Sequence, residues 1–373
     1  MGDSTHRIHV ADATDMGFLG DESVALVVTS PPYPMIEMWD DLFRQRTPGV
    51  DEALRAGDGP RAFELMHKDL DRVWAEVFRL LSDGGFACIN IGDATRTLGE
   101  RFRLYSNHAR ILSECFRLGF DVLPPVLWRK QTNAPNKFMG SGMLPAGAYV
   151  TLEHEYILVL RKGAKRTFLS AEDKRNRQES AFFWEERNTW FSDVWDFKGT
   201  RQALGTSGVR GRSAAFPFEL AYRLICMYSA RSDTVLDPFL GTGTTMFAAM
   251  AAGRHSVGVE VDGAFLPVIH EGLGAFSEEV NTYLGDRLRR HLEFCGRREQ
   301  RSLGKLKYTN ANHQMPVMTG QETRLRLEAL ETISAAGDQS FTVTYTTIDK
   351  SGTAPRLRGL RTHGQREQLA LAF

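Results

Sequence analysis

Residues 235–245 read VLDPFLGTGTT, and no other stretch of the chain is as informative about its fold. The first residues predict a short strand that ends at Asp237, and the alanine-rich residues from Thr244 onward predict a helix. Between them, Gly241 and Gly243 allow the backbone to approach a ligand closely, while the start of the helix offers unpaired N–H groups. A strand, a glycine turn and a helix in this order are typical of nucleotide-binding α/β folds.

A second apolar segment ends at residues 258–262, which read GVEVD. Carboxylates at the tip of the neighbouring strand hold ribose hydroxyls in such folds, so Glu260 and Asp262 are candidate ligand-binding residues. A nicotinamide dinucleotide is one candidate ligand, but the turn reads GTGTT and not GxGxxG. Because Asp237 disfavours a pyrophosphate and favours a positively charged ligand, we expect S-adenosylmethionine, which carries an ammonium and a sulfonium group.

The rest of the chain alternates short apolar runs with longer amphipathic ones, which predicts a parallel sheet wrapped by helices. The candidate strands are Arg7–Val10, Ser23–Thr29, Gly85–Ile91, Phe120–Trp128, Glu155–Arg161, Thr234–Leu236 and His255–Glu260. The candidate helices are Pro60–Leu81, Tyr105–Leu118, Phe216–Tyr228 and Thr244–Ala252.

Two parts of the chain break this alternation. Residues 164–212 mix basic and aromatic side chains without a period, and after residue 285 a basic run leads to a helix-like segment, 321–333, and a strand-like one, 341–348. We therefore expect one α/β domain in two parts (1–163 and 213–284), a basic-aromatic insertion (164–212) and a smaller basic C-terminal module (285–373).

Composition excludes several classes of protein. Hydrophobic residues make up 42% and charged residues 25% of the chain, as in an ordinary globular protein. No apolar run approaches the roughly 20 residues of a membrane helix, and the N-terminus resembles no secretory signal. The four cysteines are scattered without a CxxC pair, which indicates neither a disulfide framework nor a zinc site; we expect no metal and a cytoplasmic location.

The net charge is zero, but basic side chains are concentrated in two segments. Residues 161–212 carry twelve basic against seven acidic side chains, and residues 286–307 carry eight against three. Solvated surface patches would explain either run alone; two such runs in a neutral protein favour a localised contact with a polyanion.

The second motif lies within VVTSPPYPMIEMWDDLF, residues 27–43. It follows a strongly apolar strand, so Ser30, Pro31, Pro32 and Tyr33 are expected at the carboxyl end of that strand, where open α/β sheets bind ligands. The two prolines stiffen the loop and remove two N–H donors, which leaves acceptors beside an aromatic ring. Such a loop suits the exocyclic amine of a planar base.

The two motifs, in this order, resemble those of the DNA amino-methyltransferases, which methylate N4 of cytosine or N6 of adenine. The Pro-Pro-Tyr loop precedes the cofactor loop, as in the permuted β group, and the resemblance covers roughly residues 6–275. It implies a Rossmann-like methyltransferase fold, with a mixed seven-stranded sheet and helices on both faces, plus a recognition insertion and a small C-terminal module. On this resemblance, residues 1–163 are the catalytic half, 164–212 the target-recognition insertion, 213–284 the cofactor-binding half and 285–373 the basic C-terminal module. Two departures are Ala11, where the family usually has Gly, and Ser213-Ala214-Ala215, where it more often has His-Pro.

The resemblance also assigns site residues. Catalysis is expected at Ser30, Pro31, Pro32 and Tyr33. The cofactor is expected to contact Asp12, Phe216, Pro217, Asp237, Pro238, Phe239, Gly241, Gly243, Thr244, Glu260 and Asp262. We expect DNA contacts from Trp39, Lys137, Lys165, Arg166, Arg201, Arg210, Arg212, Arg290 and Arg298, and we interpret the glycine-rich loop around 133–147 either as a surface connection or as a clamp over DNA or substrate.

The resulting hypothesis is methyl transfer from S-adenosylmethionine to a cytosine flipped out of double-stranded DNA. Cytosine is favoured over adenine because the family's adenine enzymes mostly carry Asp or Asn at the position of Ser30. The alternatives are N6-adenine methylation of DNA, methylation of RNA, and a DNA-binding module without turnover. A cognate restriction endonuclease is an expected partner, and the protein is expected to be a monomer or a homodimer without a membrane association.

Overall fold

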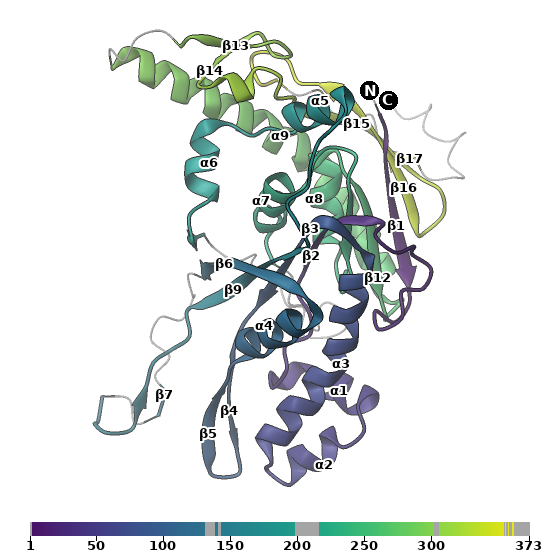
Figure 1. The fold of residues 1–373 in the computed structure, drawn as a ribbon, viewed down its shortest axis with the longest axis vertical. Coiled ribbons are helices and arrows are strands. Elements are labelled where there is room, and N and C mark those ends of the chain that lie inside the picture. Colours follow the sequence, from purple (N-terminus) through teal and green to yellow (C-terminus); the bar gives the residue numbers. More distant parts are fainter. Residues whose placement is uncertain are drawn as a thin grey trace, which may run out of the picture.

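A large mixed sheet forms the centre of the molecule (Figure 1). The computed structural model describes residues 2–130, 139–140, 143–197, 216–301, 306–353, 355, 357 and 360–361. Within these residues the sheet has eleven strands in the order β10-β6-β9-β3-β2-β11-β12-β1-β16-β15-β17.

The predicted α/β fold is confirmed, and all seven predicted strands lie side by side in the middle of this sheet. They are β1 (Ser4–Val10), β2 (Val24–Thr29), β3 (Leu81–Ile91), β6 (Phe120–Arg129), β9 (His154–Lys162), β11 (Thr234–Asp237) and β12 (His255–Glu260). Strands β3, β2, β11, β12 and β1 are parallel, and β9 runs antiparallel between β3 and β6. The carboxyl ends of the parallel strands therefore meet at one edge of the sheet.

The sheet extends beyond the predicted seven strands at both sides. Strand β10 (Val194–Asp196) pairs with β6, while β16 (Ser340–Thr347) pairs with β1 and continues to β15 (Glu328–Ala335) and β17 (Leu360–Arg361). The prediction of a helix over 321–333 is wrong, because residues 328–335 pair with β16 and bury Leu330 and Ile333. Cross-strand pairing has overridden the local helix propensity there.

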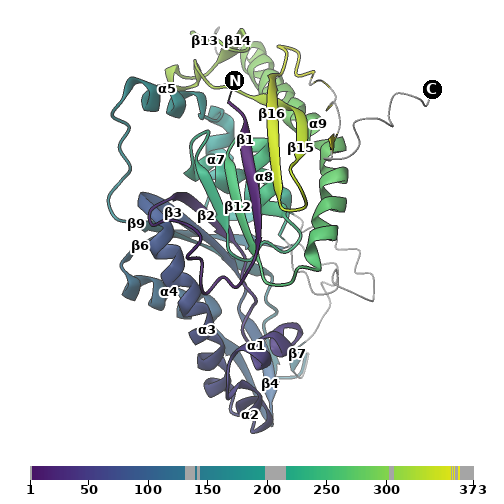
Figure 2. The same ribbon diagram turned by 90° about the vertical axis from the view of Figure 1, so that its right-hand side faces the viewer.

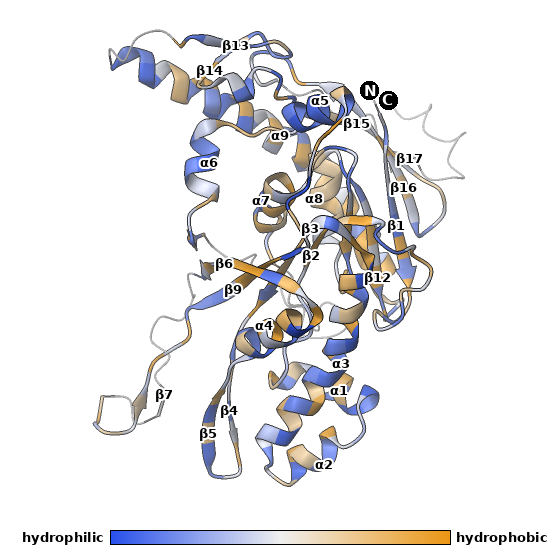
Figure 3. Ribbon diagram, viewed as in Figure 1, coloured by the Kyte–Doolittle hydropathy of each residue, from blue (hydrophilic) through white to orange (hydrophobic). Residues whose placement is uncertain are grey.

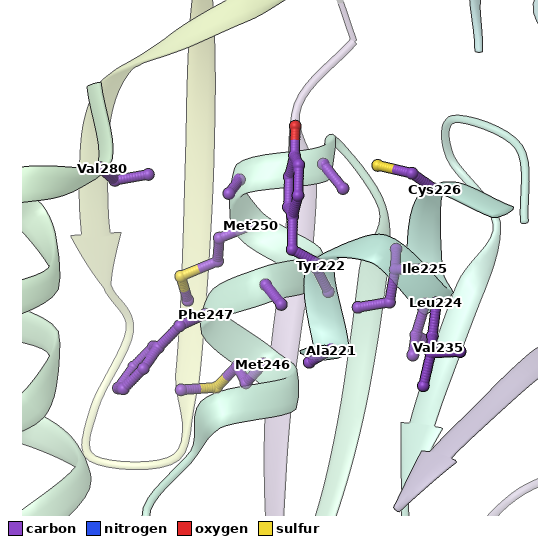
Figure 4. Close-up of a cluster of buried hydrophobic side chains, with 14 of the residues drawn as sticks. Ala221, Tyr222, Leu224, Ile225, Cys226, Val235, Met246, Phe247, Met250 and Val280 are labelled. Carbon is purple, nitrogen blue, oxygen red and sulfur yellow. The ribbon is translucent and has the colours of Figure 1, made fainter. Parts of the chain in front are cut away.

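Helices cover both faces of the sheet, as the alternation of buried side chains on β2 requires. Val24 and Val27 belong to the apolar cluster under α3 (Gly59–Leu80) and α4 (Asn107–Leu118). Leu26 and Val28 belong to the cluster under α7 (Phe218–Tyr228), α8 (Thr244–Ala252) and α9 (Phe265–Gln300). Helix α8 is apolar on all sides because it is enclosed by α7, α9 and the sheet (Figures 3 and 4).

Shorter elements surround this core. Helices α1 (Asp40–Arg46) and α2 (Val50–Arg55) follow β2, and α5 (Ala171–Glu179) and α6 (Trp184–Trp190) lie within residues 164–212. Three two-stranded sheets complete the described structure: β4 (Ala94–Leu98) with β5 (Arg101–Tyr105), β7 (Met139–Gly140) with β8 (Ala148–Tyr149), and β13 (Tyr308–Asn310) with β14 (Met315–Val317). No helix of the described residues is long and apolar enough to cross a bilayer.

Buried ion pairs join α9 to α6, which lies within residues 164–212. Arg287 is only 4% exposed, donates to both carboxylate oxygens of Glu186 on α6, and donates to the hydroxyl of Tyr222. One turn later His291 bonds Glu185 at 2.7 Å and the carbonyl of Pro316 at 2.9 Å. The basic run after residue 285 is therefore partly an internal connection, and α9 runs unbroken through the expected boundary between residues 284 and 285.

The charged state of His291 predicts a pH-dependent stability. Burial disfavours the imidazolium, but hydrogen bonds with Cys295 and Glu185 outweigh burial and raise the pKa of His291 from 6.5 to about 10. Its contribution to the free energy of unfolding is complete below pH 6.5 and is lost as the pH rises toward 10. The stability difference between the wild type and His291→Gln should therefore fall by up to about 1.4 kcal/mol per pH unit in this window. Urea unfolding at a series of pH values measures it, and a constant difference would contradict the assignment.

Candidate active site

A cavity of about 360 Å³ opens at the edge of the sheet where the parallel strands end. Its wall combines the loop after β2, the turn between β11 and α8, and the end of β12, so segments some two hundred residues apart in the sequence line one space. The expected site residues that line it are Asp12, Ser30, Pro31, Pro32, Trp39, Phe216, Asp237, Pro238, Phe239, Gly241, Thr244, Glu260 and Asp262. Tyr33, Pro217 and Gly243 are expected site residues that are absent from its described lining.

Asp237 holds the two motif loops together. The hydroxyl of Thr29, at the end of β2, donates to one carboxylate oxygen at 2.6 Å, and the hydroxyl of Thr245, at the start of α8, donates to the other at 2.7 Å. The backbone N–H of Phe239 adds a third hydrogen bond. Burial raises the pKa of Asp237 to about 6, and these hydrogen bonds oppose that rise.

The glycine turn follows directly and closes onto β12. Gly241 and Gly243 have φ values of +52° and +87°, in the left-handed region that favours glycine. The N–H of Gly241 donates to one carboxylate oxygen of Glu260, and the N–H of Asp262 donates to the other. Glu260 thereby fixes the turn and its own loop while its carboxylate stays at the cavity wall.

The cavity is strongly acidic. Arg46, on α1, is the one basic side chain in the described lining, and it forms ion pairs with Asp12 at 2.9 Å and Asp69 at 2.7 Å. Partial burial opposes the charge of Asp12, but hydrogen bonds from Arg46 and Thr14 outweigh burial and lower the pKa of Asp12 to about 2. The other carboxylates of the wall are Asp41, Asp237, Glu260 and Asp262. A wall of this charge suits a ligand that carries positive charge.

A chain of hydrogen bonds orients Ser30. Its hydroxyl donates to the hydroxyl of Tyr33 at 3.1 Å, and Tyr33 donates to Glu155, at the start of β9, at 2.9 Å. Asn90 donates to both Tyr33 and Glu155, and Lys130 forms an ion pair with Glu155. Because the proton of Ser30 is directed toward Tyr33, the Ser30 oxygen keeps its lone pairs for another donor.

The ring of Tyr33 is buried, whereas the sequence predicts that its aromatic face is open to the ligand. It is 8% exposed, and burial together with the neighbouring carboxylate of Glu155 raises its pKa well above the ordinary value, so the phenol stays protonated. Gly92 makes room for the ring, because a Cβ atom there would lie 3.0 Å from it. The ring thus supports the loop, and its hydroxyl orients Ser30.

Asn107 fixes the other side of the same loop. Its side-chain amide donates to the carbonyl of Pro34 at 3.1 Å and to that of Gly92 at 2.9 Å, and its oxygen bonds His67.

Sequence reasoning missed Asn90, Asn107, Lys130, Glu155 and Arg46. The first four have a recognisable signal only in retrospect: polar residues at the ends of predicted strands or at the start of a predicted helix.

Among the residues expected to contact DNA, those that the structure describes are not brought together. Trp39 lines the cavity. Lys165 and Arg166 lie at the opposite end of the strands, where Arg166 pairs with Asp233 at the amino end of β11. Arg290 and Arg298 are on α9, Arg290 exposed and Arg298 half-buried, and α9 ends beside β13–β14, far from the cavity (Figure 1). Lys137, Arg201, Arg210 and Arg212 lie outside the described residues.

Comparisons with known proteins agree with this geometry. The sequence model of a DNA methylase family matches residues 24–271. The chain is 49% identical to the Type II methyltransferase M.MthZI of Methanothermobacter thermautotrophicus over 93% of its length and 96% of the relative's. It is 47% identical to the Type II methyltransferase M.MjaI of Methanocaldococcus jannaschii, over 74% and 94% of the two chains.

Solved structures show the same fold. TTHA0409 of Thermus thermophilus, assigned as a DNA modification methylase and crystallised with S-adenosyl-L-methionine, superposes with a TM-score of 0.56 at 34% identity. The match covers 74% of this chain and 94% of the other.

Replacing Gly243, in the glycine turn, and Gly274, within α9, by alanine should change the free energy of unfolding in opposite directions. Gly243→Ala should destabilise the protein by about 1–2 kcal/mol, because φ is +87° and the new methyl group would lie 3.3 Å from Ile269 and Phe247. Gly274→Ala, within α9 and with open space around it, should stabilise it by about 0.5–1 kcal/mol. Urea unfolding of both variants measures the difference, and equal shifts would contradict the role of the turn.

Proposed function

The chain belongs to the DNA methylase family whose sequence model matches residues 24–271, and from that premise we propose that it methylates the N4 amine of a cytosine in double-stranded DNA. At the level of the family, it is an S-adenosylmethionine-dependent DNA methyltransferase. The choice of cytosine, and the roles of individual residues, are the proposal.

The cavity fits the cofactor in size and charge. Its volume of about 360 Å³ lies within the usual range for small-molecule sites. The acidic wall complements the ammonium and sulfonium groups, and the tight turn at Gly241 leaves no side chain between the backbone and the ligand. Glu260 and Asp262 would hold the ribose hydroxyls, and Phe239 and Phe216 would supply apolar contact for the adenine.

Ser30 supports the proposed chemistry more than any other residue. An aromatic amine is a poor nucleophile because its lone pair is delocalised into the ring. The Ser30 oxygen and the Pro31 carbonyl would each accept a hydrogen bond from one N–H of the amine, which favours a tetrahedral nitrogen with a localised lone pair. S-adenosylmethionine, when bound, supplies the methyl as a sulfonium and leaves as a neutral thioether, while the amine nitrogen gains the methyl and releases one proton.

The stiffness of the loop matters for this role. Pro31 and Pro32 fix the backbone, Asn107 binds the carbonyl of Pro34, and Tyr33 directs the proton of Ser30 away from the cavity. All of these contacts are made within the protein itself, so the acceptors need little rearrangement when the base enters. Such positioning lowers the activation free energy of methyl transfer by several kcal/mol, and by up to roughly 7–11 kcal/mol in favourable cases.

Two features support the finer assignment. The residue at position 30 is Ser, which in the family this chain resembles is commoner among N4-cytosine enzymes than among adenine enzymes. The catalytic loop precedes the cofactor loop in the chain, which supports membership of the permuted β group. The relatives named Type II methyltransferases support a restriction-modification role with a cognate endonuclease as partner.

Analysis of the methylated product tests the proposal. The protein is incubated with tritiated cofactor and duplex DNA, the DNA is hydrolysed to nucleosides, and the labelled nucleoside is identified. We expect N4-methylcytosine. Labelled N6-methyladenine would show that adenine, not cytosine, is the target base. Transfer only to RNA would show that RNA, not DNA, is the substrate.

Ser30→Ala should lower kcat roughly 100-fold, the effect typical of removing one preorganised hydrogen-bond partner of a reacting group. Cofactor affinity should be unchanged, since the contact is proposed for the amine alone. Ser23→Ala is the matched control, because Ser23 is exposed and donates only to the carbonyl of Gly20. Single-turnover kinetics with a parallel cofactor titration measure both quantities. Lost cofactor affinity with preserved turnover of the bound cofactor would contradict the role of Ser30.

A further inference from the structure

We propose that the β4–β5 hairpin and the arm between β6 and β9 together form a DNA clamp, which contacts the duplex beside the target base. The hairpin comprises residues 94–105, and the described part of the arm comprises residues 139–140 and 143–153. The inference rests on the proposed function for its substrate, and it assigns the contact to a surface distinct from the 164–212 insertion.

Both segments leave the sheet at the edge that carries the cavity. The hairpin follows β3 directly after its carboxyl end, and the arm connects the end of β6 with the start of β9. The two views show them projecting together from the body, at the end of the molecule opposite α5, β13 and β14 (Figures 1 and 2). DNA that places a base in the cavity must pass this edge.

The hairpin and the arm touch each other. The rings of Phe102, on β5, and Tyr149, on β8, are stacked with centroids 4.6 Å apart and an interplanar angle of 22°. Arg96 also anchors the hairpin to α1 through a buried ion pair with Asp40. The two projections therefore form one supported surface, which is a better platform for a large ligand than two separate loops.

Large apolar side chains of this surface are exposed, beside the exposed Arg101 and the exposed Glu100. Met143 is 87% and Val150 84% exposed, and Leu104, Leu144 and Tyr149 are also exposed. Large apolar side chains left in solvent mark interaction sites, and proteins that deform DNA insert such side chains between base steps. An isolated apolar surface of this kind would fit a protein partner equally well.

The charges favour DNA. The hairpin carries three arginines and one glutamate. Arg96 is engaged by Asp40, whereas Arg101 and Arg103 have no carboxylate partner among the described residues. Most other arginines near the cavity, such as Arg44 and Arg46, are paired with aspartates. Two uncompensated guanidinium groups beside exposed apolar side chains suit phosphates next to stacked bases.

The clamp is also joined to the catalytic loop. Lys130, next to the end of β6, and Glu155, on β9, form the base of the arm and pair with each other. Glu155 accepts a hydrogen bond from Tyr33, which in turn accepts one from Ser30. DNA bound by the clamp would therefore be held a few side chains away from the proposed acceptor of the target amine.

The salt dependence of DNA binding by the full-length protein tests the clamp. The double variant R101A/R103A should weaken duplex binding and lower the slope of log Kd against log salt by about 2, since each phosphate contact contributes about 0.9. The matched control is R175A/R177A, which removes two exposed charges from α5 at the other end of the molecule and should keep the wild-type slope. Cofactor affinity and melting temperature of both variants are measured to confirm intact folding.

A second variant tests the apolar part. Met143→Ser combined with Val150→Ser should weaken duplex binding at least several-fold with an unchanged salt slope. A slope of log Kd against log salt that stays at the wild-type value in R101A/R103A would overturn the clamp. A slope lowered only in R175A/R177A would assign the DNA contact to residues 164–212. Wild-type DNA affinity in both clamp variants would make the surface a site for a protein partner. These outcomes are independent of the methylated product, so failure of the clamp and failure of the proposed function are distinguishable.

Discussion

The buried carboxylate of Asp237 is the contact on which the site depends. It joins the end of β2 to the start of α8 through two threonine hydroxyls, each on a different oxygen. A carboxylate in this position is costly without partners, because burial penalises its charge. Three hydrogen bonds offset that cost, and they do so only when the Ser-Pro-Pro-Tyr loop and the glycine turn are in register. The packing of β2 beside β11 and the geometry of the site therefore depend on the same contacts.

The same principle operates on the other side of the cavity. Ser30, Tyr33 and Glu155 form a hydrogen-bonded chain across β2 and β9, with Asn90 of β3 between them. Each hydroxyl in this chain has a defined donor direction, so the free lone pairs of Ser30 follow from its neighbours. The chain also ends at the base of the β6–β9 arm, and substrate binding and catalysis can therefore share one rigid support.

The strands, the main helices and the two motif loops were predictable because each depends on local sequence: apolar runs, glycine turns and prolines. Residues such as Glu155, Asn107 and Arg46 were not, because each is a single polar residue whose partner lies far away in the chain. The segment 328–335 was mistaken for a helix because the pairing that makes it a strand comes from β16. Tyr33 was placed in the correct loop, but its burial depends on the space above Gly92.

A crystal structure of the protein with a cofactor analogue and a target duplex would show whether Ser30 and Pro31 contact the amine of the target base. The account predicts an extrahelical base whose amine nitrogen lies within hydrogen-bonding distance, about 3 Å, of both the Ser30 hydroxyl and the Pro31 carbonyl. The analogue would occupy the cavity between Asp12 and Glu260. A bound base whose amine faces away from Ser30, or an analogue bound outside this cavity, would contradict the account.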